Sequence, residues 1–232
     1  MSDKVISLIP ARGGSKGVPD KNIKPIAGKP LLYWCLKATM DCKEIDEIWV
    51  ATDSPKIEKV VRDIFEDEIC IFHRSLESAT DTAPTEIVME EFSREHDFSK
   101  LFLIQATNPL LKSADLAEAL TILDSGGYAS IVSVVKMCRF FWGEAINKTG
   151  VALNYEPQRR QRRQDFNNAY FCENGAFYLT TWEAWGNSHC RISGKVGLLE
   201  MSDDTVYEID TVDDWITVEK LLQKRLANGY SV

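Results

Sequence analysis

Short apolar runs alternate with amphipathic segments over the first 135 residues of the chain. Five runs have the length and composition of buried strands, namely 5–10, 47–52, 69–72, 101–105 and 130–135. Four segments between them have helical patterns, namely 31–38, 55–65, 84–96 and 113–123. This alternation predicts βαβ units, and therefore an α/β fold with a mostly parallel, twisted sheet that carries helices on both faces.

The alternation stops after residue 135. Residues 136–174 are rich in Arg, Gln, Asn and aromatic side chains and follow no clean period, which predicts a protruding arm or a flap and suggests a contact between subunits. A strand at 175–180 and a helix at 211–226 complete the chain. We therefore expect one Rossmann-like domain over 1–232, with the arm inserted at about 136–174.

Net charge and hydropathy limit the partners of the chain. The formal net charge is −8, from 27 basic and 35 acidic side chains, and an acidic protein is a poor general ligand for nucleic acid or anionic membrane. The sequence holds no apolar run near the roughly 18 residues that span a bilayer, and its first residues lack the apolar core of a signal peptide. We expect a cytoplasmic protein that binds neither nucleic acid nor membrane.

Residues 11–22, ARGGSKGVPDKN, follow the first predicted strand. Glycines let a backbone approach a ligand, and Arg12, Lys16 and Lys21 add three positive charges, a combination that suits a polyphosphate. The spacing matches neither a Walker A loop nor the dinucleotide G-x-G-x-x-G, which disfavours a Rossmann oxidoreductase. Ligands of such sheets bind beyond the carboxyl ends of strands, where 11–22 and 105–109 are expected. The simpler alternative is an ordinary loop with solvated lysines.

Two further clusters of charge lie in the second half of the chain. Glu208 and Asp210 are two apart on an extended segment and point to one side, so they could hold Mg²⁺. On spacing alone, a polar strand edge is the simpler interpretation of this pair. The basic run 159–163 is either a solvated face or, with Gln164 and Asn174 nearby, a site for an anionic sugar.

The segment 11–22 resembles the signature of the acylneuraminate cytidylyltransferases, the CMP-sialic acid synthetases. Segments similar to other motifs of this family follow in the same order along nearly the whole chain: Ala-Thr-Asp at 51–53, His-Arg-Ser at 73–75, Thr-Asp-Thr at 80–82 and Gln-Ala-Thr-Asn-Pro at 105–109. Arg-Arg-Gln-Asp at 162–165, followed by Glu-Asn-Gly at 173–175, resembles the arm of the animal-type enzymes.

The resemblance implies transfer of CMP from CTP to the anomeric hydroxyl of a nine-carbon 2-keto sugar acid, N-acetylneuraminate or KDN, with release of pyrophosphate. It also implies Mg²⁺ as cofactor and a homodimer in which the arm reaches the neighbouring site. The same reaction on legionaminate, pseudaminate or Kdo is an alternative. A catalytically weak CTP-binding regulatory protein is another, because Glu208 stands where the family usually has Asp.

The resemblance also implies a role for individual residues. The nucleotide would be bound by Arg12, Gly13, Gly14, Ser15, Lys16, Lys21, Asn22, Arg74 and Thr85. The sugar acid would be bound by Gln105, Thr107, Arg162, Arg163, Gln164 and Asn174. The metal would be held by Asp210 and Glu208, and the catalytic charges would come from Arg12, Lys16, Lys21 and Arg163.

Overall fold

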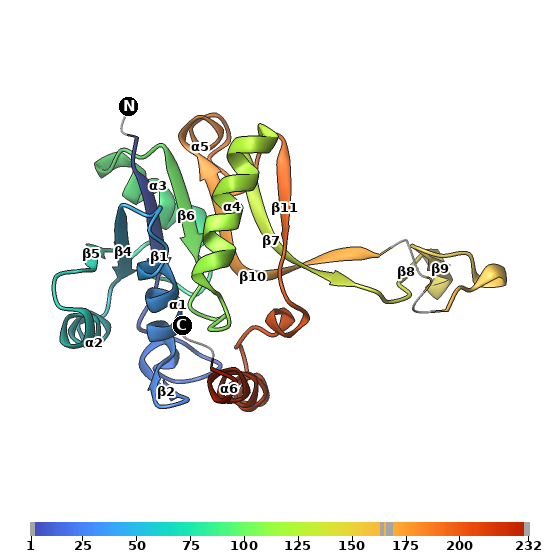
Figure 1. The fold of residues 1–232 in the computed structure, drawn as a ribbon, viewed down its shortest axis with the longest axis horizontal. Helices are drawn as coiled ribbons and strands as arrows, with labels where there is room; N and C mark the ends of the chain where they lie inside the picture. The colour runs from blue at the N-terminus through green and yellow to red at the C-terminus, as the bar shows by residue number, and fades with distance from the viewer. Residues whose placement is uncertain (1–2, 163–164, 166–168, 230–232) are drawn as a thin grey trace.

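A seven-stranded sheet forms the centre of the computed structural model, which describes residues 3–162, 165 and 169–229 (Figure 1). The strands are β1 (Val5–Pro10), β4 (Glu47–Thr52), β5 (Cys70–His73), β6 (Lys100–Ile104), β7 (Ser130–Met137), β10 (Tyr170–Thr181) and β11 (Val196–Glu200). Their order across the sheet is β11-β7-β10-β6-β1-β4-β5. β10 is antiparallel to both of its neighbours, whereas the other pairings are parallel, so the predicted α/β sheet is confirmed.

Helices cover both faces because successive side chains of each strand point to opposite sides. In β1, Ile9 packs into the cluster under α1 (Leu31–Met40), α2 (Pro55–Phe65) and α4 (Ser113–Gly126). Ile6 and Leu8 pack into the cluster under α3 (Thr85–Glu95) and α5 (Trp182–Ser188). Across residues 3–162, 165 and 169–229, none of the helices has the length and apolar character that crossing a membrane requires.

A third apolar cluster lies below the sheet, where α6 (Val212–Ala227) packs against α1 and the small hairpin of β2 (Pro25–Ile26) and β3 (Lys29–Pro30). Val18 of the glycine-rich segment and Ile209 are both buried in this cluster. The cluster therefore joins the loop after β1 to the segment that carries the two C-terminal carboxylates.

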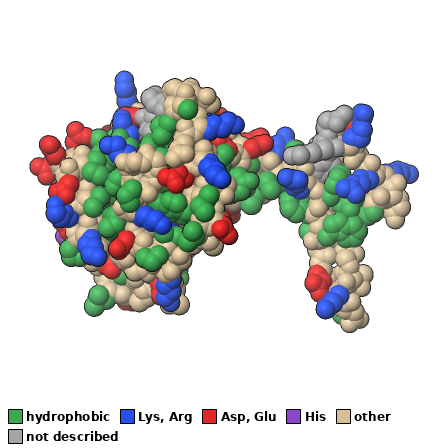
Figure 2. Space-filling view, turned by 90° about the horizontal axis from the view of Figure 1, so that it is seen from below, with side chains coloured by type: hydrophobic (Ala, Val, Ile, Leu, Met, Phe, Trp, Pro, Cys, Tyr) green, Lys and Arg blue, Asp and Glu red, His purple; other side chains and the backbone are tan. Residues whose placement is uncertain are grey.

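The arm projects from the body as an extension of β7 and β10, and it ends in a hairpin of β8 (Trp142–Glu144) and β9 (Gly150–Ala152) (Figures 1 and 2). The pairing of β10 with β7 shifts register between Glu173 and Tyr178, where the chain leaves the body. The Ser133 hydroxyl bonds both backbone groups of Phe177 there, at 2.8 and 3.0 Å, and so satisfies them at the irregularity.

Several elements differ from the sequence prediction. β10 begins at Tyr170, five residues before the predicted strand, because its first half belongs to the arm. The hairpin β8–β9, the helix α5 and the strand β11 were not predicted. Each is short, and the alternation of β11 is weakened by a glycine in the pattern Val-Gly-Leu-Leu-Glu.

The N-terminus of α6 gives a test of local stability. Thr211 and Asp214 form a capping box in which Asp214 N–H donates to Thr211 Oγ1 at 3.2 Å and Thr211 N–H donates to Asp214 Oδ2 at 2.8 Å. Thr211→Ala should lower the free energy of unfolding by about 1 kcal/mol, measured by urea titration. Thr217→Ala in the interior of the same helix is the control and should not lower it, because Ala has a higher helix propensity than Thr by up to about 0.7 kcal/mol. Equal stability of the two variants would contradict a role for the cap.

Candidate functional site

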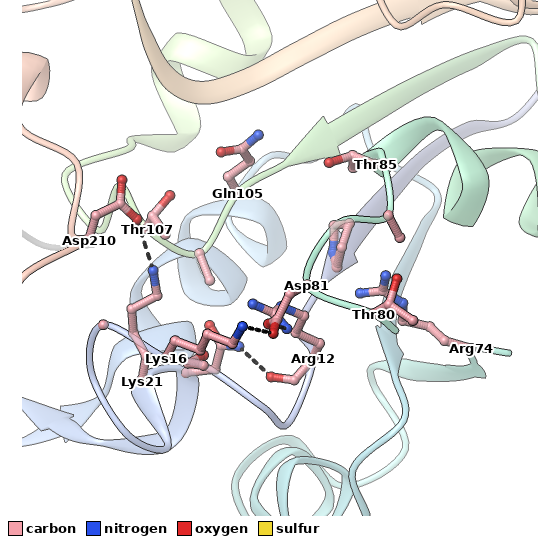
Figure 3. Close-up of a pocket in the computed structure, with 16 residues that line it drawn as sticks. Arg12, Lys16, Lys21, Arg74, Thr80, Asp81, Thr85, Gln105, Thr107 and Asp210 are labelled. Carbon is pink, nitrogen blue, oxygen red and sulfur yellow. Dashed lines mark hydrogen bonds and ion pairs between the residues drawn. The ribbon is translucent and has the colours of Figure 1, made fainter. Parts of the chain in front are cut away.

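A cavity of 340 Å³ opens beyond the carboxyl ends of β1, β5 and β6 (Figure 3). Its lining is polar and carries four basic and two acidic side chains. The lining residues are Pro10, Arg12, Ser15, Lys16, Gly17, Lys21, Asn22, Arg74, Thr80, Asp81, Ala83, Thr85, Gln105, Ala106, Thr107 and Asp210. The cavity thus lies at the edge of the sheet where the sequence predicted a ligand.

Hydrogen bonds and one close backbone contact fix the position of the loop after β1. Asn22 is buried, and its Nδ2 donates to the carbonyl oxygen of Arg12 at 3.1 Å. Lys21 Nζ donates to the carbonyl oxygen of Ile209 at 2.8 Å and lies 3.2 Å from Asp210 Oδ1. A Cβ at Gly17 would lie 2.1 Å from the carbonyl oxygen of Asp210, so only glycine allows this approach.

The loop after β5 closes the cavity on the opposite side with a carboxylate. Asp81 forms ion pairs with Arg12 Nη1 and with Lys16 Nζ, the latter at 2.5 Å. Hydrogen bonds from Lys16 and Arg12 hold the pKa of the Asp81 carboxyl below its usual range. Two of the three cations of the glycine-rich segment therefore converge on one acidic side chain (Figure 3).

Arg74 lies at the end of β5 and is positioned by α3. Its Nη2 donates to the carbonyl oxygen of Ser78, and Glu91 of α3 in turn accepts from the hydroxyls of Ser75 and Ser78, at 2.5 and 2.8 Å. Burial lowers the pKa of Arg74 below its ordinary value, although the charges of Asp53 and Glu91 oppose this shift. The first residue of α3, Thr85, lines the same cavity.

The loop after β6 forms the far wall. Gln105 and Thr107 line the cavity, and the carbonyl oxygen of Thr107 accepts from Ile209 N–H at 3.0 Å. The Thr107 hydroxyl is buried and has no hydrogen-bond partner within the described part of the chain. A buried hydroxyl without a partner is costly, so this group is suited to a bound ligand.

Asn174, which is predicted to bind the sugar acid, does not line this cavity. It is fully buried, and its Nδ2 donates to Thr205 Oγ1 at 2.9 Å and lies 3.2 Å from Met201 Sδ. The backbone carbonyl oxygen of Asn174 accepts a hydrogen bond from Asn108 Nδ2 at 2.9 Å. Asn108 Nδ2 also donates to the backbone carbonyl oxygen of Thr205 at 2.8 Å. Because its amide is used internally, Asn174 supports the wall behind the cavity.

The two C-terminal carboxylates occupy different environments. Asp210 lines the cavity and its side chain is 75% exposed. Glu208 is partly buried outside the lining, against Gly175, which has a φ of +61°. Burial and the nearby charge of Asp210 raise the pKa of Glu208. No cluster of three or more His, Cys, Asp or Glu suited to a metal occurs in the described ranges.

Other predicted site residues lie outside the cavity. Gly13 and Gly14 do not line it. Gly13 N–H instead donates to Asp53 Oδ1 at 2.9 Å, and Gly13 packs against Ser54. Arg162 lies in the segment between β9 and β10 and pairs with Asp165. Arg163 and Gln164 lie outside the described residues.

Ten of the predicted residues do line the cavity: Arg12, Ser15, Lys16, Lys21, Asn22, Arg74, Thr85, Gln105, Thr107 and Asp210. The prediction omitted six other lining residues, Pro10, Gly17, Thr80, Asp81, Ala83 and Ala106. The motif-like segment Thr-Asp-Thr at 80–82 was the available signal for two of them.

Comparison with known proteins gives relatives over almost the whole chain. The N-acylneuraminate cytidylyltransferase of Oncorhynchus mykiss is 38% identical over 230 residues, which are 97% of this chain and 51% of that protein. N-acylneuraminate cytidylyltransferase A of Danio rerio is 36% identical, over 99% of this chain and 52% of that protein. The chain thus spans about half the length of these relatives. The CMP-N,N'-diacetyllegionaminic acid synthase of Legionella pneumophila is 28% identical, over 95% of this chain and 97% of that protein.

Solved structures share the fold. A CMP:2-keto-3-deoxy-manno-octonic acid synthetase complexed with CTP aligns with a TM-score of 0.69 and 17% identity, over 96% of this chain and 100% of the other. A 4-diphosphocytidyl-2C-methyl-D-erythritol synthase from Anaerococcus prevotii aligns with a TM-score of 0.67 and 14% identity, over 95% of this chain and 96% of the other. The sequence model of one family, described as cytidylyltransferase, matches residues 6–181, which include every strand of the sheet except β11. On this match, the chain belongs to the cytidylyltransferase family.

Proposed function

We propose that the protein transfers CMP from CTP to the anomeric hydroxyl of a nine-carbon 2-keto sugar acid, N-acetylneuraminate or KDN, and releases pyrophosphate. Family membership and the relatives named N-acylneuraminate cytidylyltransferase support this proposal. One observation carries it: Arg12, Lys16, Lys21 and Arg74 come from two separate loops and converge on one cavity. Such a cluster of cations in an otherwise acidic chain suits a triphosphate.

The chemistry requires positioning and charge stabilisation. The sugar hydroxyl oxygen attacks the α-phosphorus of CTP and loses its proton to water. A new P–O bond forms, and the bond to the β-phosphate oxygen breaks with its electron pair on pyrophosphate. Arg12, Lys16 and Lys21 would neutralise the charge that develops on this leaving group. The buried anchor of Lys21 on Ile209 fixes its ammonium before the ligand binds, which lowers the cost of ordering.

The two ends of the cavity would bind different parts of the substrates. Arg74 and Thr85, both positioned by α3, would lie at the cytosine and ribose. Gln105 and Thr107 form the opposite wall and would address the sugar acid, with the unpartnered Thr107 hydroxyl as one contact. Arg162, Arg163 and Gln164 would bind the sugar acid from the arm of a second subunit.

We propose Mg²⁺ as the cofactor, held by Asp210 and Glu208. Burial raises the pKa of Glu208 most, and the charge of Asp210 raises it further, so a divalent cation beside both carboxylates would stabilise their charged forms. Mg²⁺ is commonly bound by one or two carboxylates together with substrate phosphates, which fits a donor set of two. When bound, the ion would supply positive charge at a phosphate oxygen.

We further propose that the protein is a homodimer whose arms exchange between sites. Exposed apolar side chains gather along the arm, namely Trp142, Ile146, Val151, Leu153, Tyr170 and Phe171. They lie beside basic side chains on a part of the molecule that stands away from the body (Figure 2). An apolar surface of this kind is typical of a protein interface. The arm residues that the structure describes, 136–162, 165 and 169–174, do not line the cavity of their own chain, so we propose that they serve a neighbour.

A second sugar is favoured by one specific relative. The legionaminic acid synthase of Legionella pneumophila aligns over nearly its full length, whereas the chain spans half of the N-acylneuraminate relatives. Legionaminate is therefore the second candidate substrate.

The first test measures pyrophosphate release from CTP and Mg²⁺ with N-acetylneuraminate, KDN, legionaminate, pseudaminate and Kdo. We expect turnover with N-acetylneuraminate or KDN, and a decrease in kcat/KM of more than about tenfold in Arg12→Ala, because charge on pyrophosphate is no longer neutralised. Arg94→Ala is the matched control, since Arg94 is exposed on α3 outside the cavity. A folded Arg12→Ala enzyme with wild-type turnover would contradict the role. CTP binding without turnover on any sugar would favour the regulatory protein.

The second test concerns the metal. Asp210→Asn should abolish Mg²⁺-dependent turnover while the melting temperature stays unchanged, because the exposed Asp210 side chain contributes little to packing. Asp213→Asn removes the same charge three residues away, outside the cavity lining, and should keep its activity. Turnover of Asp210→Asn that saturates with Mg²⁺ as in the wild type would place the metal elsewhere.

The third test concerns exchange of the arms. Arg12→Ala and Arg163→Ala should each be inactive alone, but unfolding and refolding them together should restore about a quarter of wild-type activity, since half of random dimers are mixed and each holds one intact site. Mixing Arg12→Ala with Asp210→Asn is the control, because both changes lie in the same cavity and no site becomes intact. Absence of rescue in the first mixture would contradict arm exchange.

A further inference from the structure

The cations of the glycine-rich segment already have an anionic partner in the protein itself. Asp81 pairs through one carboxylate oxygen with Arg12 and through the other with Lys16, at 2.5 Å (Figure 3). Asp81 comes from the loop after β5, far from both cations in the sequence. Two oxygens of one anion that bridge these cations have the arrangement that a phosphate group offers.

We propose that Asp81 is an internal competitor for the polyphosphate and sets the affinity of the nucleotide site. The inference rests on the proposed function, in which Arg12 and Lys16 bind the triphosphate. A phosphate that contacts both cations has to replace the Asp81 carboxylate and break two ion pairs. The affinity for triphosphate and for pyrophosphate is then lower than the cations alone would give, and the return of Asp81 assists release of pyrophosphate.

Asp81 lies beyond the part of the loop after β5 that hydrogen bonds to α3 hold in place. Ser75 and Ser78, at the beginning of the loop, are held by Glu91 of α3. Asp81 follows this anchor, and its side chain is 33% exposed. The backbone hydrogen bonds on either side of it, from Ala79 N–H to the Ser75 oxygen and from Ala83 N–H to the Thr80 oxygen, close local turns. Displacing Asp81 therefore leaves the position of Arg74 intact.

The proposed competition concerns two of the four cations. Lys21 is bound to Ile209 and Asp210, and Arg74 is bound to Ser78. Removing the charge of Asp81 leaves the cavity with four basic side chains and Asp210 as its remaining acidic one. The gain in affinity should therefore appear for anions with several phosphates, which extend over Arg12 and Lys16 together.

The test is calorimetric titration with inorganic tripolyphosphate in EDTA, at one fixed ionic strength, so that a metal ion does not contribute. Asp81→Asn should bind about three- to tenfold more tightly than the wild type, as expected for loss of two partly exposed ion pairs. Asp124→Asn is the matched control, because Asp124 also pairs with a cation, Lys100, but at the amino end of β6. The control should bind like the wild type. Asp81→Ser serves as a second variant if Asp81→Asn is poorly folded.

Unchanged or weaker binding in the folded Asp81 variants would overturn the proposal, since Asp81 would then only preorganise the cations. Tighter binding together with no turnover on any sugar would support the competitor and contradict the proposed reaction. Failure of the wild type and of both Asp81 variants to bind tripolyphosphate would overturn the competitor and the proposed phosphate site together.

Discussion

The site depends on one contact between the two ends of the chain. The Lys21 ammonium is bonded to the carbonyl oxygen of Ile209, and Gly17 lies against the backbone of Asp210, so the first loop and the C-terminal segment hold each other. Ile209 is buried below them in the cluster with Trp215 of α6. Without this contact, the cations after β1 and the carboxylate Asp210 would not be held at one cavity.

A buried polar network supports the opposite wall. Asn108, Asn174 and Thr205 are fully or almost fully buried and are bonded to one another, which joins the loop after β6 to β10 and to the segment before Glu208. The amide nitrogens of Asn108 and Asn174 are paired in this network, whereas the buried Asn108 Oδ1 has no hydrogen-bond partner in the described part of the chain. The network therefore supports the wall of the cavity that Gln105 and Thr107 form.

The sequence predicted the sheet because its strands are short apolar runs and its helices have caps that can be read locally, as at Thr211 and Asp214. It also predicted that the basic side chains of segment 11–22 belong to one site, because glycine and positive charge occur together there. It did not predict that Asn174 faces inward or that Asp81 meets Arg12. Both depend on contacts between distant segments, such as β10 with the residues around 205, and a local pattern carries no information on such contacts. The role of the arm remains a prediction.

The position of β10 has a consequence for how the chain folds. β6 and β7 follow each other among the strands of the body, yet β10 lies between them in the sheet and pairs with both. Their facing edges stay without backbone partners until residues 170–181 arrive, after the whole arm has been made. Such long-range pairing is slow, because a large loop must close before any contact stabilises it. The chain therefore has to be synthesised through the arm and return to the body before the central sheet is complete.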